Sequence, residues 1–428
     1  MKSNLSQKDI EKAFRSALSN GLIRDVDTAV IFQDLSFLEE RIKKLKSLFP
    51  PQTLHAIAIK ANPLTRILEF IKLLDVGLEA ATSGEVHLAL KTGLEPGKIV
   101  YDSPVKTIGE LESALKTGIH LNIDNLSELE RVNNLLRTIS SKSTIGIRIN
   151  PQVGIGTIAG SSVAGEYSKF GIPIKYKRNE LTKAFLNHPW LTGVHLHVGS
   201  QGCPMQMLID GIGVLFDFVT ELNEKRSLAG FPLISIFDIG GGLPVSYEKN
   251  ALPVSMEDYA NAIQENYPSL FTPDFSLITE FGRWVHVNTG WVASRVEYVK
   301  NDPSINTAMI HVGADLFLRE CLNAKDWQHE YSVLDKNGYL KEGKDDYPYH
   351  LAGPLCFSGD ILAKNLELPK IEEGDYLVIH DAGGYTFSMW SRYNSRQTPR
   401  ILGYFNNGEK TEVLKERETF GDIYSFWT

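Results

Sequence analysis

The sequence predicts an α/β protein: a (β/α)8 barrel of parallel strands, followed by a second, mostly β domain. Three observations predict this fold. Eight short, apolar, strand-like runs occupy roughly the first two thirds of the chain, and helix-length patterns lie between them. Such alternation is typical of parallel strands joined by crossover helices. From about Trp284 onward the strand-like runs are instead separated by Gly, Pro and Asn clusters, which indicates a β domain.

The eight expected strands are short, and most are rich in β-branched or aliphatic residues. They cover residues 56–61, 77–81, 99–102, 120–124, 145–150, 194–198, 236–239 and 277–280. Of the helices between them, 108–116 is opened by Thr107, and 126–136 follows the cap residue Asn125. In the second domain the expected strands cover 291–299, 307–312, 376–380 and 400–405.

These patterns divide the chain into three parts. Residues 1–35 are expected to pack on the β domain, residues 36–284 to form the barrel, and residues 285–428 to form the β domain itself. The amino-terminal segment carries no functional motif, and its first residues are polar with helical periodicity.

Composition narrows the class of protein. Lys and Arg number 44 against 52 Asp and Glu, so the formal charge is −8, and we expect neither nucleic acid nor an anionic membrane as a partner. The three cysteines are widely spaced, which indicates reduced thiols in a cytoplasmic protein. No apolar run reaches the length of a membrane span. The histidines lack ligand spacing such as HExxH, so no metal site is expected.

Unusual residues gather at the carboxyl ends of the expected barrel strands, where active sites of such barrels lie. Lys60 lies near the end of the first run. His197 lies near the end of the sixth run, and Ser200 follows that run. The seventh leads into Gly240, Gly241 and Gly242, and the eighth into Glu280, Gly282 and Arg283. Backbone amides of a glycine loop can approach an anion closely, and an arginine beside it adds charge. Each feature alone is more often structural: a turn, a salt bridge or a core histidine. Their coincidence on one rim favours a phosphorylated cofactor attached to Lys60.

These residues lie in motifs that resemble the barrel-type pyridoxal-phosphate-dependent amino acid decarboxylases, the alanine racemase-like and ornithine decarboxylase-like fold. The motifs are AIKAN at Lys60, SGE at 83–85, SKFGI at 168–172, HVGSQ, DIGGG, EFGR, GPLC at 353–356, SGD at 358–360 and HDAGGYTFSMWSRYNSR at 380–396. The last group, with SGDILAK, is more similar to diaminopimelate decarboxylase than to ornithine decarboxylase.

The resemblance implies a role for each matching residue. Lys60 would hold pyridoxal 5'-phosphate covalently, His197 would stack on its ring, and Glu280 would face the pyridine nitrogen. Ser200, the amides of Gly240 to Gly242, Arg283 and Tyr385 would surround the phosphate, with Gly282 in the same loop. Cys356 would supply a proton after decarboxylation, reaching in from the second subunit of a homodimer with shared active sites. A buried structural thiol is the alternative for Cys356.

Two departures from the family pattern concern the substrate. Phe357 stands directly after Cys356, where an acidic residue usually pairs with the distal ammonium of the substrate. Arg319 matches an arginine that holds a distal carboxylate in diaminopimelate decarboxylases, whereas Asn323 replaces a tyrosine. EFGR also carries Phe281 where proline is usual. Arg319, Asn323, Phe357, Arg283 and Tyr385 are the expected substrate contacts.

The hypothesis is therefore pyridoxal-phosphate-dependent decarboxylation of an amino acid, with a modified or conjugated amino acid without a free distal ammonium as the candidate substrate. Meso-diaminopimelate, giving lysine, is the leading alternative. Ornithine or lysine is disfavoured because the acidic residue is absent, and a racemase is disfavoured by the GPLC segment. A catalytically inactive regulatory homologue is the alternative from another class.

Overall fold

The computed structural model describes residues 5–247, 254–342 and 346–428. The chain forms two compact units. One, the barrel unit, comprises Arg41–Val245 and Pro253–Trp284. The other, the β unit, comprises Met1–Glu40, Ser246–Leu252 and Val285–Thr428.

The barrel unit contains a closed sheet of eight parallel strands, as the sequence predicts. They are β2 (Leu54–Ala58), β3 (Gly77–Ala80), β4 (Ile99–Tyr101), β5 (His120–Ile123), β6 (Ile145–Asn150), β8 (Gly193–His195), β9 (Ile236–Asp238) and β10 (Ser276–Thr279). Their spatial order is β5-β4-β3-β2-β10-β9-β8-β6, and pairing of β5 with β6 closes the ring. The short β7 (Ile172–Pro173) pairs only with β6. All eight expected runs are therefore barrel strands, and their carboxyl ends meet at one rim.

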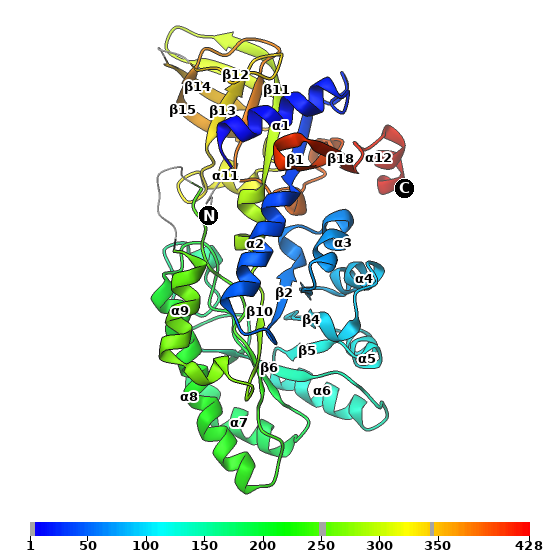
Figure 1. Cartoon of the computed structure of the whole chain (residues 1–428), viewed down its shortest axis with the longest axis vertical. Helices are drawn as coiled ribbons and strands as arrows, with labels where there is room; N and C mark the ends of the chain where they lie inside the picture. Colours follow the sequence, from blue (N-terminus) through cyan, green and yellow to red (C-terminus); the bar gives the residue numbers. More distant parts are fainter. Residues whose placement is uncertain (1–4, 248–253, 343–345) are drawn as a thin grey trace. The chain divides into compact units, whose positions relative to one another are not determined.

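Helices follow these strands around the barrel, and Figure 1 shows α3 to α6 side by side beyond β2 to β5. The helices are α2 (Leu35–Leu48), α3 (Thr65–Leu73), α4 (Ser83–Lys91), α5 (Ile108–Thr117), α6 (Leu126–Leu136), α7 (Ile174–Asn187), α8 (Met205–Leu228), α9 (Met256–Asn266) and α10 (Gly282–His286). The side chain of Thr107 caps α5 in a capping box with Glu110, and Asn125 caps α6. These caps satisfy amide groups that a helix start leaves unpaired, which explains why both helices begin where the sequence predicts.

Two strands, β2 and β8, end three residues earlier than expected, and this places site residues in loops. β2 ends at Ala58, and Lys60 lies in a 3-10 turn, Ile59–Ala61. β8 ends at His195. The Leu196 amide still donates to the Asp238 carbonyl at 3.0 Å, after which the chain leaves the sheet. Lys60 and His197 therefore stand just beyond the strand ends, where a side chain can reach the mouth of the barrel.

The β unit is built on nine strands. They are β1 (Ala29–Asp34), β11 (Gly290–Asn301), β12 (Asn306–Ile310), β13 (Tyr331–Leu334), β14 (Asp346–Ala352), β15 (Ile361–Pro369), β16 (Tyr376–Ile379), β17 (Arg400–Phe405) and β18 (Lys410–Lys415). Their order is β15-β14-β12-β11-β1-β17-β18, and β13 pairs with β16, which pairs with β11. The sequence did not predict β1, which lies at the centre, antiparallel to β11 and parallel to β17.

The amino-terminal helix α1 (Gln7–Ser19) contributes to the core of the β unit. Ser6 caps it, accepting a hydrogen bond from the amide of Asp9. Its apolar face packs on the sheet, where Phe32 of β1 stacks on Trp291 of β11 with ring centroids 3.9 Å apart, and Phe14 lies against both rings. Large aromatic rings bury much apolar area, so this cluster ties the start of the chain to the β unit. The short helices α11 (Leu318–Leu322) and α12 (Phe420–Trp427) complete this unit.

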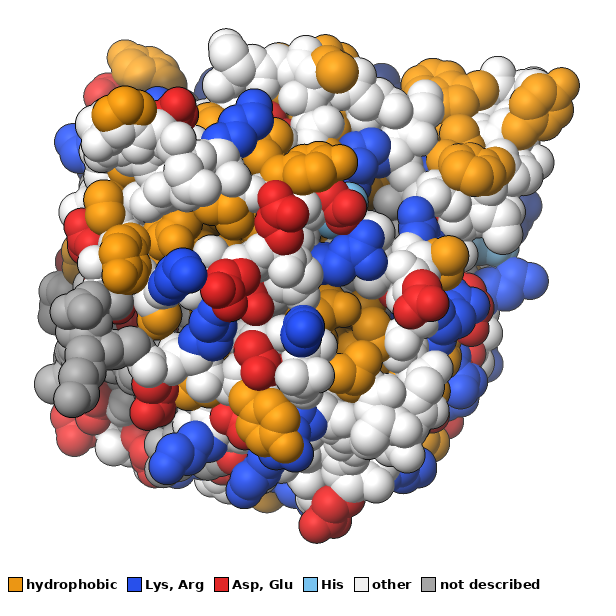
Figure 2. Space-filling view, turned by 90° about the horizontal axis from the view of Figure 1, so that it is seen from above, with side chains coloured by type: hydrophobic (Ala, Val, Ile, Leu, Met, Phe, Trp, Pro, Cys, Tyr) orange, Lys and Arg blue, Asp and Glu red, His pale blue; other side chains and the backbone are white. Residues whose placement is uncertain are grey.

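The surface bears charges of both signs. Figure 2 shows acidic and basic side chains interspersed on the face that it presents, with hydrophobic side chains in several separate groups. Among the described residues no helix combines the length and the hydropathy that crossing a bilayer requires.

Candidate active site

Lys60 lies at the carboxyl end of the barrel strands, next to a buried acid. Its Nζ atom is 2.5 Å from Oε2 of Glu79, a residue of β3. Glu79 is fully buried, and burial raises the pKa of its carboxyl to about 8 against the opposing charge of Lys60. The amine thus lies beside a carboxyl group that can exchange a proton with it near neutral pH.

A chain of buried charges crosses the barrel beneath this rim. Asp102, after β4, pairs with Nη1 of Arg148 at 3.0 Å, and its other oxygen lies 3.4 Å from Nδ1 of His195. Nε2 of His195 lies 3.6 Å from Oε2 of Glu280. Residues at the ends of three strands, β4, β8 and β10, thereby form a row of an acid, an imidazole and a second acid. Charges buried at this depth need such partners, because water cannot solvate them.

These partners fix the ionisation states. Burial alone would lower the pKa of the His195 imidazole. The acidic side chains of Asp102, Asp238 and Glu280 instead raise it to about 9, so the ring is an imidazolium at neutral pH. Burial opposes ionisation of Glu280, yet His195 holds the pKa of its carboxyl well below the usual range. Burial raises the pKa of Asp238 well above its usual value, with Glu280 adding to the effect. Arg148 and His195 likewise lower the pKa of Asp102 against the effect of burial, so the network keeps the carboxylates of Asp102 and Glu280 charged.

His197 stands over that carboxylate. Its Nδ1 lies 3.7 Å from Oε2 of Glu280 and accepts a hydrogen bond from the amide of Gly241 at 3.3 Å. Burial lowers the pKa of His197, so this imidazole is neutral. A neutral imidazole beside a carboxylate can stack on a planar ligand while the carboxylate reaches the ligand's edge.

The glycine triplet after β9 forms a cradle that admits no side chains. A Cβ on Gly240 would stand 2.5 Å from the Leu196 carbonyl oxygen, and one on Gly241 would stand 2.5 Å from that of Glu280. Gly240 and Gly242 also have positive φ, at 63° and 102°. Backbone groups of such a loop can approach an anion closely, which explains why the sequence has three glycines in succession.

An arginine and a hydroxyl lie on the same rim of the barrel. Nε of Arg283 donates to Oγ of Ser200 at 3.0 Å, so the loop after β8 and the start of α10 hold each other. Gly282 lies against β2, and a Cβ there would stand 2.8 Å from the Cβ of Ala58. Only glycine therefore lets α10 begin close enough to bring Arg283 to the rim.

The site fits a cofactor with an aromatic ring and a phosphate. Within the described part of the chain, both carboxylate oxygens of Glu280 are buried without a hydrogen-bond donor, which is costly unless a ligand supplies one. The glycine cradle and Arg283 would hold a phosphate, and Lys60 supplies an amine. A metal ion fits less well: His195, His197 and Glu280 offer atoms within 4.8 Å of one another, but a protonated His195 has no lone pair to donate.

In the β unit, the guanidinium of Arg319 lies near two aromatic rings. Its guanidinium carbon is 4.1 Å from the ring centroid of Trp327 and 5.5 Å from that of Tyr385. Nη2 also donates to the Tyr385 carbonyl at 2.9 Å, and Tyr385 itself has a positive φ of 59°. Stacking and hydrogen bonding fix the guanidinium plane, as carboxylate recognition requires. Asn323 is the C-cap of α11: its backbone amide donates to the Arg319 carbonyl at 2.8 Å, and its side-chain amide donates to Oδ2 of Asp326 at 2.7 Å.

The loop with Cys356 and Phe357 is anchored by Asp360. The carboxylate of Asp360 accepts hydrogen bonds from the amides of Ala314 and Leu355, both at 2.6 Å. The amide of Cys356 donates to Oδ1 of Asn394 at 2.8 Å. The Cys356 thiol is exposed, which disagrees with a buried structural role, and the Phe357 ring is 37% exposed and packs edge-on against Tyr393. The loop is held rigidly while its two functional candidates face outward.

The structure thus brings the expected residues into separate clusters. Within the barrel unit it gathers Lys60, His197, Ser200, the glycine triplet, Glu280, Gly282 and Arg283. Within the β unit Arg319 contacts Tyr385, and Cys356 adjoins Phe357. Sequence reasoning missed Glu79, Asp102, Arg148, His195 and Asp238. Their signal was present: each is a charged residue, or one that can be charged, on or beside an apolar strand.

Fold and site together define a class: barrel enzymes that act through pyridoxal phosphate. The sequence pattern of the family described as pyridoxal-dependent decarboxylase, pyridoxal binding domain, matches residues 35–287. The match covers more than half of the chain, so the chain belongs to the pyridoxal-dependent decarboxylases. Its cofactor is pyridoxal 5'-phosphate, and it is a carboxy-lyase whose substrate is an amino acid.

Individual relatives indicate which type of pyridoxal-dependent decarboxylase the chain is. Diaminopimelate decarboxylase of Helicobacter pylori is 31% identical over 94% of this chain and 96% of its own, and that of Archaeoglobus fulgidus is 28% identical over 94% and 93%. A solved structure of the H. pylori enzyme with L-lysine superposes with a TM-score of 0.82 at 28% identity, over 96% of this chain and 99% of the other. A lysine/ornithine decarboxylase of Vibrio vulnificus, 21% identical over 92% of this chain and 97% of its own, shares the fold at a TM-score of 0.75. The chain is therefore a decarboxylase of the diaminopimelate decarboxylase type.

Proposed function

We propose that this enzyme decarboxylates an amino acid whose far end carries a carboxylate or a similar anionic group. The observation that carries the proposal is Arg319, whose guanidinium lies against the rings of Trp327 and Tyr385 and is oriented by its hydrogen bond to the Tyr385 carbonyl. An arginine oriented in this way is a group that proteins use to bind carboxylates. Phe357 stands where a carboxylate would pair with a distal ammonium, so the chain keeps a group for a distal anion and lacks one for a distal cation.

The barrel residues then have distinct roles. When bound, pyridoxal phosphate supplies an electron-poor ring that accepts the electron pair left by departing carbon dioxide. Lys60 would hold the cofactor covalently, with Glu79 beside the amine to take or return a proton. Glu280, kept ionised by His195, would pair with the protonated pyridine nitrogen. His197 would pack on the face of the ring.

Four groups would hold the phosphate of the cofactor: the amides of the glycine triplet, Ser200, Arg283 and the hydroxyl of Tyr385. Arg283 would also contact the substrate. Cys356 would deliver a proton to the carbon that has lost its carboxyl group.

Meso-diaminopimelate is the first substrate candidate. The relatives named above are diaminopimelate decarboxylases, and its distal carboxylate matches Arg319. On this proposal the product is lysine. The distal ammonium would then need a partner other than residue 357.

A modified or conjugated amino acid is the second candidate, and Phe357 favours it. A phenyl ring cannot neutralise an ammonium, and an unpaired charge against it would be destabilising. Acylation or conjugation of the distal amine removes that charge. The exposed Phe357 ring, held against Tyr393, would then contact the added group.

We further propose a homodimer in which Cys356 and Phe357 of one subunit complete the site at Lys60 of the other. The exposure of both side chains supports this arrangement, because a proton donor and a specificity residue act only when covered by a site. Cys356 also has a rigid anchor through Asn394, as a donor in trans requires.

The test is carbon dioxide release from the purified, cofactor-loaded enzyme. The panel pairs meso-diaminopimelate with its mono-N-acylated derivative, and adds glutamate and both enantiomers of lysine and of ornithine. The proposal predicts turnover of one member of the first pair and at most weak turnover of lysine and ornithine. Preference for ornithine or lysine would contradict it.

The same experiment distinguishes the two substrate candidates. Efficient turnover of meso-diaminopimelate, with the acylated compound inactive, would identify meso-diaminopimelate as the substrate. Efficient turnover of the acylated compound, with meso-diaminopimelate inactive, would identify a modified amino acid. The matched variant Phe357→Glu restores a carboxylate at the position and should raise kcat/KM for substrates with a free distal ammonium by about tenfold, the worth of one charge-assisted contact.

A further inference from the structure

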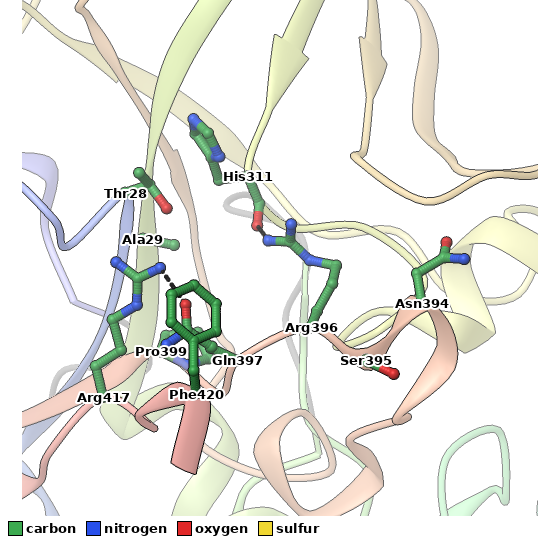
Figure 3. A pocket seen from close by; sticks show the side chains of 10 residues that line it. All are labelled: Thr28, Ala29, His311, Asn394, Ser395, Arg396, Gln397, Pro399, Arg417 and Phe420. Carbon is green, nitrogen blue, oxygen red and sulfur yellow. Dashed lines mark hydrogen bonds between the residues drawn. The ribbon is translucent and has the colours of Figure 1, made fainter. Parts of the chain in front are cut away.

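A hollow lies in the β unit, and all the residues that line it belong to that unit. It encloses about 300 Å³, the lower end of the range for small-molecule sites. Figure 3 shows its lining: Thr28, Ala29, His311, Asn394, Ser395, Arg396, Gln397, Pro399, Arg417 and Phe420. No residue with a carboxylate is among them, whereas two arginines and a histidine are.

The carboxylates around the hollow are already paired. Asp27 lies 3.0 Å from Arg24 and 3.4 Å from Arg400, and Glu416 lies 2.6 Å from Arg400. On the other side, Nε of Arg396 lies 2.9 Å from Asp315, and its Nη2 donates to the His311 carbonyl. The acids are thus matched by neighbouring arginines.

Among the described residues, Arg417 has no such ion-pair partner. Its Nη2 donates to Oε1 of Gln397 at 2.8 Å, and within the described ranges it forms no ion pair. Burial lowers the pKa of its guanidinium; the charge of Asp27 opposes this shift, and the charges of Arg396 and Arg24 add to it. Asp27 is itself ion-paired with Arg24 and Arg400, so Arg417, with Nε and Nη1 still able to donate, is a partly buried cation that an anion can stabilise.

The shape of the hollow adds a second requirement. In Figure 3 the side chains of Arg417 and Arg396 are drawn on opposite sides, with the Phe420 ring between them in this view and His311 beyond. Phe420 is 80% exposed, and Pro399 and Ala29 extend the apolar wall. Cationic donors beside an apolar wall suit a ligand with an oxyanion and an apolar body.

We propose that this hollow is a binding site, separate from the decarboxylation site, for a small molecule that carries a carboxylate or phosphate group on an apolar body. Arg417 binds the oxyanion with its free donors, and Phe420 covers the apolar part. The ligand also touches the segment 394–397, whose first residue holds the Cys356 amide. Occupancy therefore steadies the loop that carries Cys356.

The first test compares two ligands that differ only in charge. Isothermal titration of the cofactor-loaded enzyme uses benzoate and its neutral counterpart benzamide, with inorganic phosphate as a third arm. We expect saturable benzoate or phosphate binding, and benzamide at least about tenfold weaker than benzoate, the loss expected for a charge-assisted pair. If inorganic phosphate binds more tightly than benzoate, the ligand carries a phosphate group. If benzoate binds more tightly, the ligand carries a carboxylate. No saturable binding of either anion, or equal binding of benzoate and benzamide, overturns the proposal.

The second test locates the site. Arg417→Gln should abolish the preference for the anion, Arg417→Lys should retain part of it, and Arg178→Gln on the barrel surface should leave it unchanged. Hydrogen exchange of the wild-type enzyme needs no variant: the anion should slow exchange of the Cys356 amide and of residues 395–397. Unchanged affinity in a folded Arg417→Gln enzyme, or protection confined to other segments, would show that the anion binds elsewhere and refute the assignment.

Discussion

The Nζ atom of Lys60 lies 2.5 Å from Oε2 of Glu79, and Glu79 has no access to solvent. A lysine must lose its proton before it can bond to a carbonyl carbon, whereas an ionised carboxylate at this distance holds the proton on the amine. Burial raises the pKa of the Glu79 carboxyl to about 8, towards the range in which a lysine amine titrates. We therefore expect the charge on Glu79 to influence the pH at which Lys60 becomes reactive.

Replacing Glu79 by Gln should therefore shift cofactor uptake to lower pH. Without the negative charge Lys60 loses its proton more readily, and the midpoint of the pH dependence should fall by about one unit or more. The measurement is the rate at which apoenzyme develops cofactor absorbance across the pH range. Glu79→Asp serves as the control that keeps a carboxyl group. An unchanged midpoint in Glu79→Gln would mean that Glu79 does not govern the amine.

His195 should act on turnover only through Glu280. His195→Gln removes the positive charge that holds the pKa of Glu280 low, so Glu280 becomes protonated more easily. The sign is definite: kcat of this variant should be lowest at acid pH and recover as pH rises. Glu280→Gln should lose about a hundredfold in kcat at every pH, because no titration restores its charge. A flat loss in His195→Gln would contradict this assignment.

The barrel was predictable from sequence because its signal is local. Each strand is a short apolar run and each helix has its own start signal, such as Thr107 or Asn125. The site loops were predictable for a related reason: Gly240 to Gly242 and Arg283 follow strands directly, and parallel strands bring their carboxyl ends together.

What the sequence did not reveal depends on contacts between distant segments. β1 belongs to the sheet only because residues 290–294 and 400–404 pair with it, more than two hundred residues further along the chain. The buried network of Asp102, Arg148 and His195 likewise arises across three strands, and no single run shows that their side chains meet. Their role emerges only when the barrel closes.

Glu320 gives a stability prediction. It is 2% exposed, accepts a hydrogen bond from Tyr331 at 3.4 Å, and burial raises the pKa of its carboxyl well above 4.5. The folded protein therefore keeps a proton that the unfolded chain loses above pH 4.5, and stability falls as pH rises from there to the native pKa.

The variant Glu320→Gln should remove this dependence. Relative to it, the wild type should lose about 1.4 kcal/mol of unfolding free energy per pH unit within that window. Denaturant unfolding at several pH values measures the difference. A constant difference across the window would contradict the burial of a neutral carboxyl group at this position.

Mixing inactive variants tests the shared active sites. Lys60→Ala and Cys356→Ala should each be nearly inactive alone. In a mixed dimer one of the two composite sites contains both intact residues, so each such dimer should have about half of the activity of the wild-type dimer. Activity is measured after subunit exchange, which is verified with differently tagged chains. Absence of recovery despite exchange would place both residues in one chain.

The most direct test of the central claim measures how Arg319 discriminates between substrates. For the wild type and Arg319→Gln, kcat/KM is determined for the best substrate of the panel and for its counterpart without the distal carboxylate, such as lysine for diaminopimelate. We predict that the wild type prefers the anionic substrate by about a hundredfold and that Arg319→Gln loses most of this preference, since a bidentate charged contact is lost. A wild type that favours the counterpart, or a variant with unchanged preference, would contradict a substrate recognised by its anionic far end.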